Sequence, residues 1–385
     1  MRRAWFPVSF QLELPLCGGM EIIMKKMRFA IIGYGGQGSW HANRLIGKAG
    51  SDLDRDYFDV AGVYDINPEK NKLAEENGFS VYRTFEEVLA DASANAAVVA
   101  TPNDVHKELC IALMDAGKHV VCEKPVAMNV AELDEMLAAA KRNNVVFSVH
   151  QNRRWDPDYL NVRHVYESGK LGDVFCIESR VHGSRGIPGD WRNEKVHGGG
   201  MVFDWGIHLF DQMLYWMDSP IRSIYAVMNH VTNGECDDGF KVITQFENGI
   251  QYHAEVGTSN FINMPRWYML GCNGTAIMTD WGHESGKIVT VTDWENKDAV
   301  PIMAGAGLTK TMAPRNGEST SEYPFPDLWK NASEYFVNFA KACDGEEELI
   351  VTHAQMRRVM KFVEACFESY EQNKVITDFE KRCLQ

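Results

Sequence analysis

The chain has 385 residues, 45% of them hydrophobic and 24% charged, which is typical of globular proteins and long enough for two domains with separate cores. Because 53 acidic residues outnumber 39 basic ones, giving a net charge of -14, we do not expect a nucleic-acid partner. The nine cysteines form no CxxC pair or Cys/His cluster, and no apolar run reaches the roughly 18 to 20 residues of a membrane span. We therefore expect a cytoplasmic protein with reduced thiols, no metal site and no membrane association.

Residues 1–26 are expected to be a poorly ordered extension without a structural role. The charged start and apolar middle of a signal peptide are only faintly present, because Pro7, Gln11 and Glu13 interrupt the apolar stretch. Met24 and Met27 stand directly before the first predicted strand, so the extension is consistent with an upstream start codon.

A strand, a glycine-rich turn and a helix are predicted next, over residues 28–46. The turn carries Gly33, Gly35, Gly36, Gln37 and Gly38. A second strand, residues 58–64, ends at Asp65, 27 residues beyond Gly38 and close to where a ribose-binding acid belongs. This combination predicts a dinucleotide site, because glycines permit a tight turn and close approach of a pyrophosphate to a helix N-terminus. The Asp65 carboxylate would accept ribose hydroxyls and repel a 2′-phosphate, which favours NAD over NADP.

Helices and strands keep alternating up to residue 149. We predict helices at 68–77, 85–90, 106–116 and 130–142, and further strands near Val81 and at 96–100, 119–122 and 145–149. Six strands with intervening helices indicate a parallel sheet with a ligand crevice at its carboxyl edge. Asp65, Asn103 and Lys124 each follow a strand directly, so all three are expected at that edge.

A candidate acid/base pair follows three glycines, Gly198 to Gly200. Asp204 stands four positions before His208, so on a helix both side chains would share one face and the carboxylate would orient the imidazole. Lys124 would complete this site. Asp204 also suits the N-cap of the helix that bears His208.

These motifs, in this order and spacing, resemble the Gfo/Idh/MocA oxidoreductase family: the glycine loop, residues 101–103 with His106, Glu123-Lys124-Pro125, and the glycines with Asp204 and His208. The resemblance covers residues 27–375. It implies an α/β fold, with an N-terminal Rossmann domain built on a parallel sheet and a C-terminal α/β domain with an open, mainly antiparallel mixed sheet. It also implies an NAD(P)-dependent dehydrogenase or reductase acting on CH–OH groups.

Carried over from the family, the catalytic residues are Lys124, Asp204 and His208. Oxidation of a carbinol requires its hydroxyl to lose a proton, which His208 would accept, while an ammonium at Lys124 would stabilise the developing alkoxide. The resemblance adds further candidates to the cofactor-binding set, namely Thr101, Asn103, His106 and Glu123.

The resemblance also implies substrate-binding residues. Asn152 and Arg154, just after the last Rossmann strand, are candidates for polyol hydroxyls, with an interdomain salt bridge as the alternative. Trp191 and Arg192 suit a sugar face and its hydroxyls, but they suit a core tryptophan with a snorkelling arginine equally well. Pro125 is a candidate for a cis bond that aims the Lys124 amine.

We place the dinucleotide-binding domain at residues 27–150 and a substrate-binding and oligomerisation domain at 151–385, whose last helix is expected to pack back on the first domain. Strands are predicted at 221–230, 240–246, 250–256, 266–270 and 275–279, and helices at 328–343 and 354–372. Residues 295–327 are predicted to be a long loop, which would either cover the cleft or an interface or be a plain surface excursion. The family's broad sheet face implies a homodimer or homotetramer.

Two functions remain open at this stage. The first is an NAD-dependent dehydrogenase that transfers a hydride between nicotinamide and a secondary carbinol of a sugar, cyclitol or related polyol. The alternative, a variation within the same family, is a glycoside-cleaving enzyme that keeps NAD tightly bound and acts through transient oxidation at C3. A nucleotide sensor without catalysis would not need Lys124 or His208.

Overall fold

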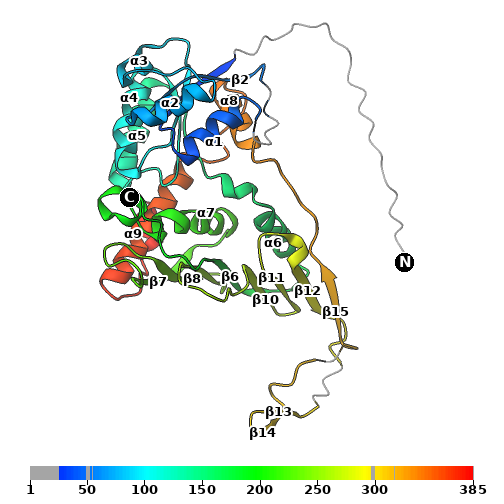
Figure 1. Cartoon of the computed structure of the whole chain (residues 1–385). Helices are drawn as coiled ribbons and strands as arrows, with labels where there is room; N and C mark the ends of the chain where they lie inside the picture. The colour runs from blue at the N-terminus through cyan, green and yellow to red at the C-terminus, as the bar shows by residue number, and fades with distance from the viewer. Residues whose placement is uncertain (1–25, 49–52, 54, 296–299, 316, 385) are drawn as a thin grey trace, which may run out of the picture.

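Two large β-sheets with helices packed against them form the body of the described part of the chain (Figure 1). The computed structural model describes residues 26–48, 53, 55–295, 300–315 and 317–384. The parallel sheet and the larger mixed sheet confirm the predicted fold class. The extension predicted over residues 1–26 lies outside the described residues, apart from Lys26.

The first sheet has five parallel strands in the order β2-β1-β3-β4-β5. Its strands are β1 (Met27–Ile32), β2 (Phe58–Tyr64), β3 (Ala96–Val99), β4 (His119–Cys122) and β5 (Phe147–Val149). They alternate with α1 (Gly36–Leu45), α2 (Pro68–Glu76), α3 (Phe85–Ala90), α4 (His106–Asp115) and α5 (Val130–Asn143). Because β3 and β4 are fully or largely buried, they consist of apolar runs without alternation.

The sixth strand predicted near Val81 is wrong. Val81 forms only an isolated bridge to Val63, and the chain then turns into α3. Thr84 caps that helix by accepting the backbone N–H of Glu87 at 3.3 Å, so the helix begins before a strand can extend.

Two glycines let α1 pack directly on β1. Gly33 has φ +88°, a conformation that favours glycine, and it forms the turn between the two elements. A Cβ on Gly38 would lie 1.8 Å from the carbonyl oxygen of Gly33. The N-terminus of α1 is therefore held at the carboxyl edge of the sheet.

The second sheet has eight strands in the order β15-β12-β11-β10-β6-β9-β8-β7. It is antiparallel except for the central pair of β6 (Val174–His182) and β9 (Gln251–Gly257). The other strands are β7 (Ile221–Asn229), β8 (Gly239–Phe246), β10 (Trp267–Gly271), β11 (Gly274–Met278), β12 (Gly286–Val291) and β15 (Thr320–Pro324). Burial alternates along β7 and β8, so one face of the sheet covers α7 (Ile207–Trp216) and α9 (His353–Glu371).

The predictions for this half missed β6, β12 and β15, as well as α6 (Pro157–Glu167). The long loop predicted over residues 295–327 is wrong in part, since β15 pairs with β12 at the sheet edge. Within the described part of that stretch, β13 (Ile302–Ala304) and β14 (Gly307–Thr309) form a hairpin that points away from the body (Figure 1). The hairpin therefore does not cover the cleft of its own chain.

The C-terminal helices return to the first sheet. In α8 (Glu334–Cys343), the rings of Phe336 and Phe339 pack against Phe29 of β1, with centroids 5.8 and 6.3 Å apart. In α9, Arg357 forms an ion pair with Asp134 of α5 at 2.8 Å. These contacts hold the two sheets in one body. Among the described residues, no helix combines the length and apolarity that crossing a bilayer would take.

Replacing Gly38 by alanine is expected to lower the free energy of unfolding by about 1–3 kcal/mol or more, because its Cβ would meet backbone that cannot withdraw. The matched control is Gly36→Ala, since a Cβ on Gly36 has no atom within 4 Å. Urea unfolding of both variants without cofactor tests this. Equal stability of the two variants would contradict the packing role of Gly38.

Candidate active site

A cavity of about 1200 Å³ lies at the carboxyl edge of the parallel sheet and is lined by residues from both halves of the chain. Most of the predicted site residues line it, namely Gly33, Gly35, Gly36, Gln37, Asp65, Thr101, Asn103, Glu123, Lys124, Asn152, Trp191, Arg192, Asp204 and His208. Gly38, His106 and Arg154 do not line it. Residues that the sequence did not single out also take part, including Lys70, Arg153, His197 and Trp205.

The glycine loop leaves room at the N-terminus of α1. A Cβ on Gly35 or Gly36 would have nothing within 4 Å, so the backbone N–H groups there are open to a phosphate. Asp65 stands beside this loop and accepts the backbone N–H groups of Tyr34 at 2.6 Å and Asn67 at 2.8 Å. This cradle fits the pyrophosphate and ribose of a dinucleotide.

Glu123 is held by two buried histidines. Its Oε1 lies 2.7 Å from Nε2 of His41 and 3.0 Å from Nδ1 of His150, while its Oε2 accepts the backbone N–H of Lys124 at 3.1 Å. Burial alone would raise the pKa of Glu123, but His150 and His41 outweigh burial and hold that pKa well below its ordinary value. Glu123 is therefore a fixed carboxylate on the cavity wall, directly before Lys124 in the chain.

Lys124 joins the two halves of the chain. Its ammonium Nζ lies 3.0 Å from Oδ1 of Asp204 and donates to the backbone carbonyl of the same residue at 3.0 Å. Nε of Arg192 lies 3.4 Å from the same carboxylate oxygen. Burial would raise the pKa of Asp204, but Lys124 and Arg192 lower it further than burial raises it. The Lys124–Pro125 bond is cis.

The hydrogen-bonded pair expected between Asp204 and His208 is not formed. Within the described chain, Nδ1 of His208 is buried without a hydrogen-bond partner, and the Asp204 carboxylate faces Lys124 and Arg192. The reason is local: Asp204 lies in a π-helical turn, Val202–Gly206, so a spacing of four residues no longer stacks two side chains as in an α-helix.

His208 is 5% exposed and lines the cavity from the start of α7. Burial, followed by the charges of Lys124 and Arg153, lowers the pKa of His208 well below its ordinary value. The imidazole is therefore neutral near pH 7, which is the form that accepts a proton.

The three glycines before the π-helical turn lie where an added Cβ would meet a close neighbour, which for Gly198 is in the other half of the chain. A Cβ on Gly198, which has φ +72°, would lie 2.9 Å from the Asn103 amide nitrogen. That amide donates to the carbonyl of Gly198 at 2.9 Å, so the nucleotide-binding half is tied to this loop. Gly200 has φ +104°. The backbone N–H of Met201 donates to the carbonyl of Asp237 at 2.9 Å, and that of Val202 donates to its Oδ2 at 2.8 Å. The turn that carries Asp204 is therefore fixed from both sides.

Arg154 does not bind substrate in this arrangement, which corrects the prediction for that residue. Its guanidinium is buried and donates to both carboxylate oxygens of Asp211, at 2.8 and 2.6 Å, and to the carbonyl of Ile350 at 2.9 Å. The salt bridge that was the alternative is present, but it is not interdomain, because Arg154 and Asp211 both lie in the predicted second domain. The neighbouring Arg153 lines the cavity in its place.

His106 is also structural. It is fully buried, and its two ring nitrogens lie 2.9 Å from the carbonyl of Pro125 and 3.0 Å from that of Thr101. Burial lowers its pKa, and the neutral ring donates its single N–H to one of these two carbonyls. Trp191 and Arg192 are half-buried on the cavity wall, with the guanidinium carbon 4.5 Å from the centroid of the indole ring.

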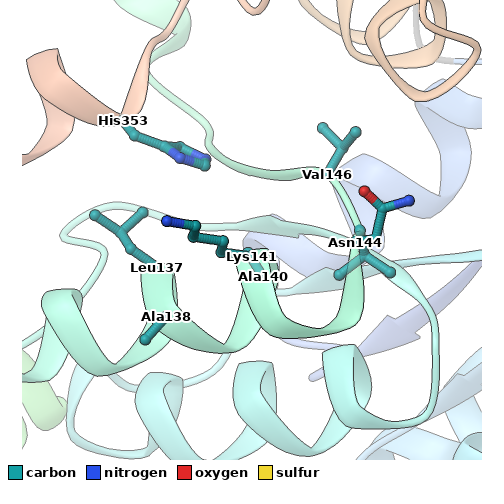
Figure 2. A pocket seen from close by; sticks show the side chains of 8 residues that line it. Leu137, Ala138, Ala140, Lys141, Asn144, Val146 and His353 are labelled. Atoms are coloured by element: carbon teal, nitrogen blue, oxygen red, sulfur yellow. The ribbon is translucent and has the colours of Figure 1, made fainter.

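A second hollow of about 520 Å³ lies between α5 and the start of α9 (Figure 2). Its walls are mostly apolar, with Lys141, Asn144 and His353 as the polar residues around it. His353 already pairs with the carbonyl of Phe147 at 2.9 Å. The hollow is separate from the glycine loop, so the larger cavity is the candidate active site.

Comparison with known proteins agrees with this geometry. Residues 27–151 match the model of an oxidoreductase family with an NAD-binding Rossmann fold, and residues 159–277 match the Gfo/Idh/MocA C-terminal domain. The crystal structure of an NAD-binding protein from Listeria innocua is similar with a TM-score of 0.87 and 46% identity, over 92% of this chain and 99% of that one. The chain belongs to the Gfo/Idh/MocA oxidoreductase family.

Two other relatives of this Gfo/Idh/MocA protein differ in how much of each chain they share with it. An uncharacterized oxidoreductase of Schizosaccharomyces pombe is 35% identical over 43% of this chain. The matched region covers 46% of that relative, so the chain spans about half of its length. A scyllo-inositol 2-dehydrogenase (NADP(+)) of Bacillus subtilis is 25% identical over 86% of this chain and 93% of its own. The family resemblance predicted from the motifs is thus confirmed, and with it an oxidoreductase with a Rossmann nucleotide-binding domain.

In this Gfo/Idh/MocA chain, Arg154→Ala is expected to lower the free energy of unfolding by about 3–5 kcal/mol, because Asp211 would be left buried and unpaired. The control Arg142→Ala removes an exposed pair with Asp115 and should cost about 1 kcal/mol or less. Urea unfolding measures both. A stable Arg154→Ala variant with a raised KM would instead support a substrate role.

Proposed function

We propose that the protein transfers a hydride between nicotinamide and a secondary carbinol of a sugar, cyclitol or related polyol, with NAD as its cofactor. One observation carries the proposal: Lys124 from the nucleotide-binding half and His208 from the other half line the same cavity as the glycine loop. The inositol dehydrogenase among the relatives supports a polyol substrate.

The bound dinucleotide would supply the hydride acceptor or donor, held by the glycine loop and Asp65. On the protein side, neutral His208 accepts the hydroxyl proton of the substrate as the carbinol is oxidised. The ammonium of Lys124 stabilises the developing alkoxide. Asp204 holds that ammonium in place at 3.0 Å and balances its charge, so its role is toward the lysine and not toward the imidazole.

NAD is proposed over NADP because the Asp65 carboxylate, fixed by two backbone N–H groups, would stand against a 2′-phosphate. Lys70 also lines this cavity, and its positive charge acts in the opposite direction, because it would attract the 2′-phosphate of NADP. The use of NADP(+) by the Bacillus subtilis relative is a property of that protein. A cytoplasmic location and a homodimer or homotetramer remain predictions.

Lys124→Ala and His208→Ala are each expected to reduce kcat by about 10²–10⁴-fold while NAD affinity changes little, because proton transfer and alkoxide stabilisation are lost but the glycine loop is intact. NADH formation from a panel of inositols and sugars, with NAD binding by calorimetry, measures both. Lys107→Ala, which lies outside the cavity and pairs with Glu135, is the control.

Full turnover in both variants would contradict the proposed chemistry. Aryl glycosides are included in the panel to distinguish the proposed dehydrogenase from the alternative, a glycoside-cleaving enzyme. Release of the aglycone without net NADH would favour a glycoside-cleaving enzyme with retained NAD, whereas net NADH supports the dehydrogenase.

Asp65→Ser is expected to shift the ratio of kcat/KM for NAD over NADP toward NADP by about tenfold or more, since the carboxylate that repels a 2′-phosphate is removed. The control is Asp59→Ser, because Asp59 lies in β2, the strand that precedes Asp65, and pairs with Arg28 away from the cavity. An unchanged ratio in Asp65→Ser would show that Asp65 does not choose the cofactor.

A further inference from the structure

Three metal-ligating side chains meet on one face of the mixed sheet. Cys176 and Glu178 stand two positions apart on β6, so both point to the same face, and His253 is the register partner of Glu178 on β9. One potential ligand atom of each residue lies within 4.8 Å of the other two. Oε1 of Glu178 is 4.0 Å from Sγ of Cys176 and 3.9 Å from Nδ1 of His253. The three groups are therefore close enough to share one ion.

This cluster of Cys176, Glu178 and His253 lies on the sheet face opposite the helices. His253 pairs in register with Ile243 of β8, which is 44% exposed. Its chain neighbours Tyr252 and Ala254 point the other way and are buried. None of the three residues of the cluster lines the candidate active site. The cluster is therefore a separate group of side chains that the proposed chemistry does not use.

An ion can reach the cluster from solvent. The side chains of Glu178 and His253 are 19% and 33% exposed, and only Cys176 is largely buried. At 3.9 Å, Nδ1 of His253 is beyond hydrogen-bond distance from Oε1 of Glu178. The thiol of Cys176 makes only a long contact with the same oxygen. These three atoms thus face one another without a strong bond among them.

The carboxylate of Glu178 is oriented by an arginine. Its Oε2 pairs with Nη2 of Arg180, which leaves Oε1 toward the cysteine and the histidine. Arg180 is itself shared with a second acid, because its Nε lies 3.3 Å from Oε2 of Glu255. Carboxylates that bind metals are commonly held by outer hydrogen bonds of this kind. Arg180 therefore positions the carboxylate while one of its oxygens stays available.

The donor set selects the class of metal. A thiolate, an imidazole and a carboxylate are ligands of Zn²⁺, at about 2.3, 2.0–2.1 and 2.0–2.2 Å respectively. Around a tetrahedral ion, these lengths place the ligand atoms about 3.3–3.6 Å apart. The observed 3.9 and 4.0 Å would close to these values with shifts of about half an ångström. Mg²⁺ and Ca²⁺ prefer oxygen ligands, so a thiol and an imidazole disfavour them.

We propose that Cys176, Glu178 and His253 bind Zn²⁺, with the three side chains as ligands and water at the fourth position. This inference is independent of the proposed function. On binding, the thiol of Cys176 releases its proton to solvent and the ion links β6 to β9. Because the guanidinium of Arg180 opposes a second cation nearby, we expect micromolar affinity. Spacing along the chain predicts no metal site, whereas strand register brings His253 beside Glu178 from a distant part of the sequence.

Metal binding to the full-length protein, kept reduced and first freed of metal by a chelator, tests the site. Calorimetry should show one equivalent of Zn²⁺. Co²⁺ in its place should give a sulfur-to-cobalt charge-transfer band, because a thiolate is among the ligands. Zn²⁺ should also raise Tm, since an ion that binds only the folded chain stabilises it.

Cys176→Ser and His253→Gln should each weaken Zn²⁺ binding by about 10–100-fold or more, because each removes one of three ligands. Cys176→Ser should also abolish the charge-transfer band. The matched control is Cys272→Ser, which removes an exposed thiol outside the cluster and should keep the affinity and the band. Urea unfolding without metal checks that the variants fold, and the more exposed His253 provides a second variant if Cys176→Ser does not.

Absence of Zn²⁺ binding, or equal affinity in the unaltered protein and in both cluster variants, would overturn the site. Loss of the charge-transfer band in Cys272→Ser would overturn it as well, because the metal would then lie at the exposed thiol. These measurements involve no turnover. Failure of the proposed dehydrogenase in the assays above would therefore leave the zinc site standing, and failure of the zinc site would leave the dehydrogenase.

Discussion

The ion pair between Lys124 and Asp204 is the contact on which the site depends. It joins the loop after β4 to the π-helical turn before α7 at 3.0 Å, and the carbonyl of Asp204 accepts a second hydrogen bond from the same ammonium. The amide of Asn103 ties the two halves together again at the carbonyl of Gly198, 2.9 Å away. These contacts fix the loop that carries the lysine against the turn that leads to the histidine, both on the wall of one cavity.

Charge around this pair is arranged so that each group keeps the protonation state it needs. His41 and His150 keep Glu123 ionised despite its burial, directly beside Lys124. Burial and the nearby cations keep His208 neutral. A carboxylate, an ammonium and a neutral imidazole thus line one cavity wall, which is what alcohol oxidation with a nearby nucleotide requires.

The local features of the molecule could be predicted from the sequence. The glycine turn and Asp65 were found because strand, turn and helix signals lie close together along the chain. The choice between neighbouring arginines could not be predicted, since Arg154 turns inward to Asp211, 57 residues away, and leaves Arg153 on the cavity. The strand β6 was missed for a similar reason, because its partners β9 and β10 follow about 75 and 90 residues later. Likewise, the π-helical turn at Asp204 gives no periodic signal, so the spacing to His208 suggested a contact that the structure lacks.

One cavity contains an amine and an imidazole from the two halves of the chain, and we propose that both contact a single alcohol oxygen beside the nicotinamide. A crystal structure of the protein with NAD and a bound polyol tests it most directly. We expect the nicotinamide ring in the cavity between the two halves, with Nζ of Lys124 and a ring nitrogen of His208 each about 3 Å from the same hydroxyl oxygen. A nicotinamide ring bound elsewhere, or a hydroxyl that contacts neither nitrogen, would contradict it.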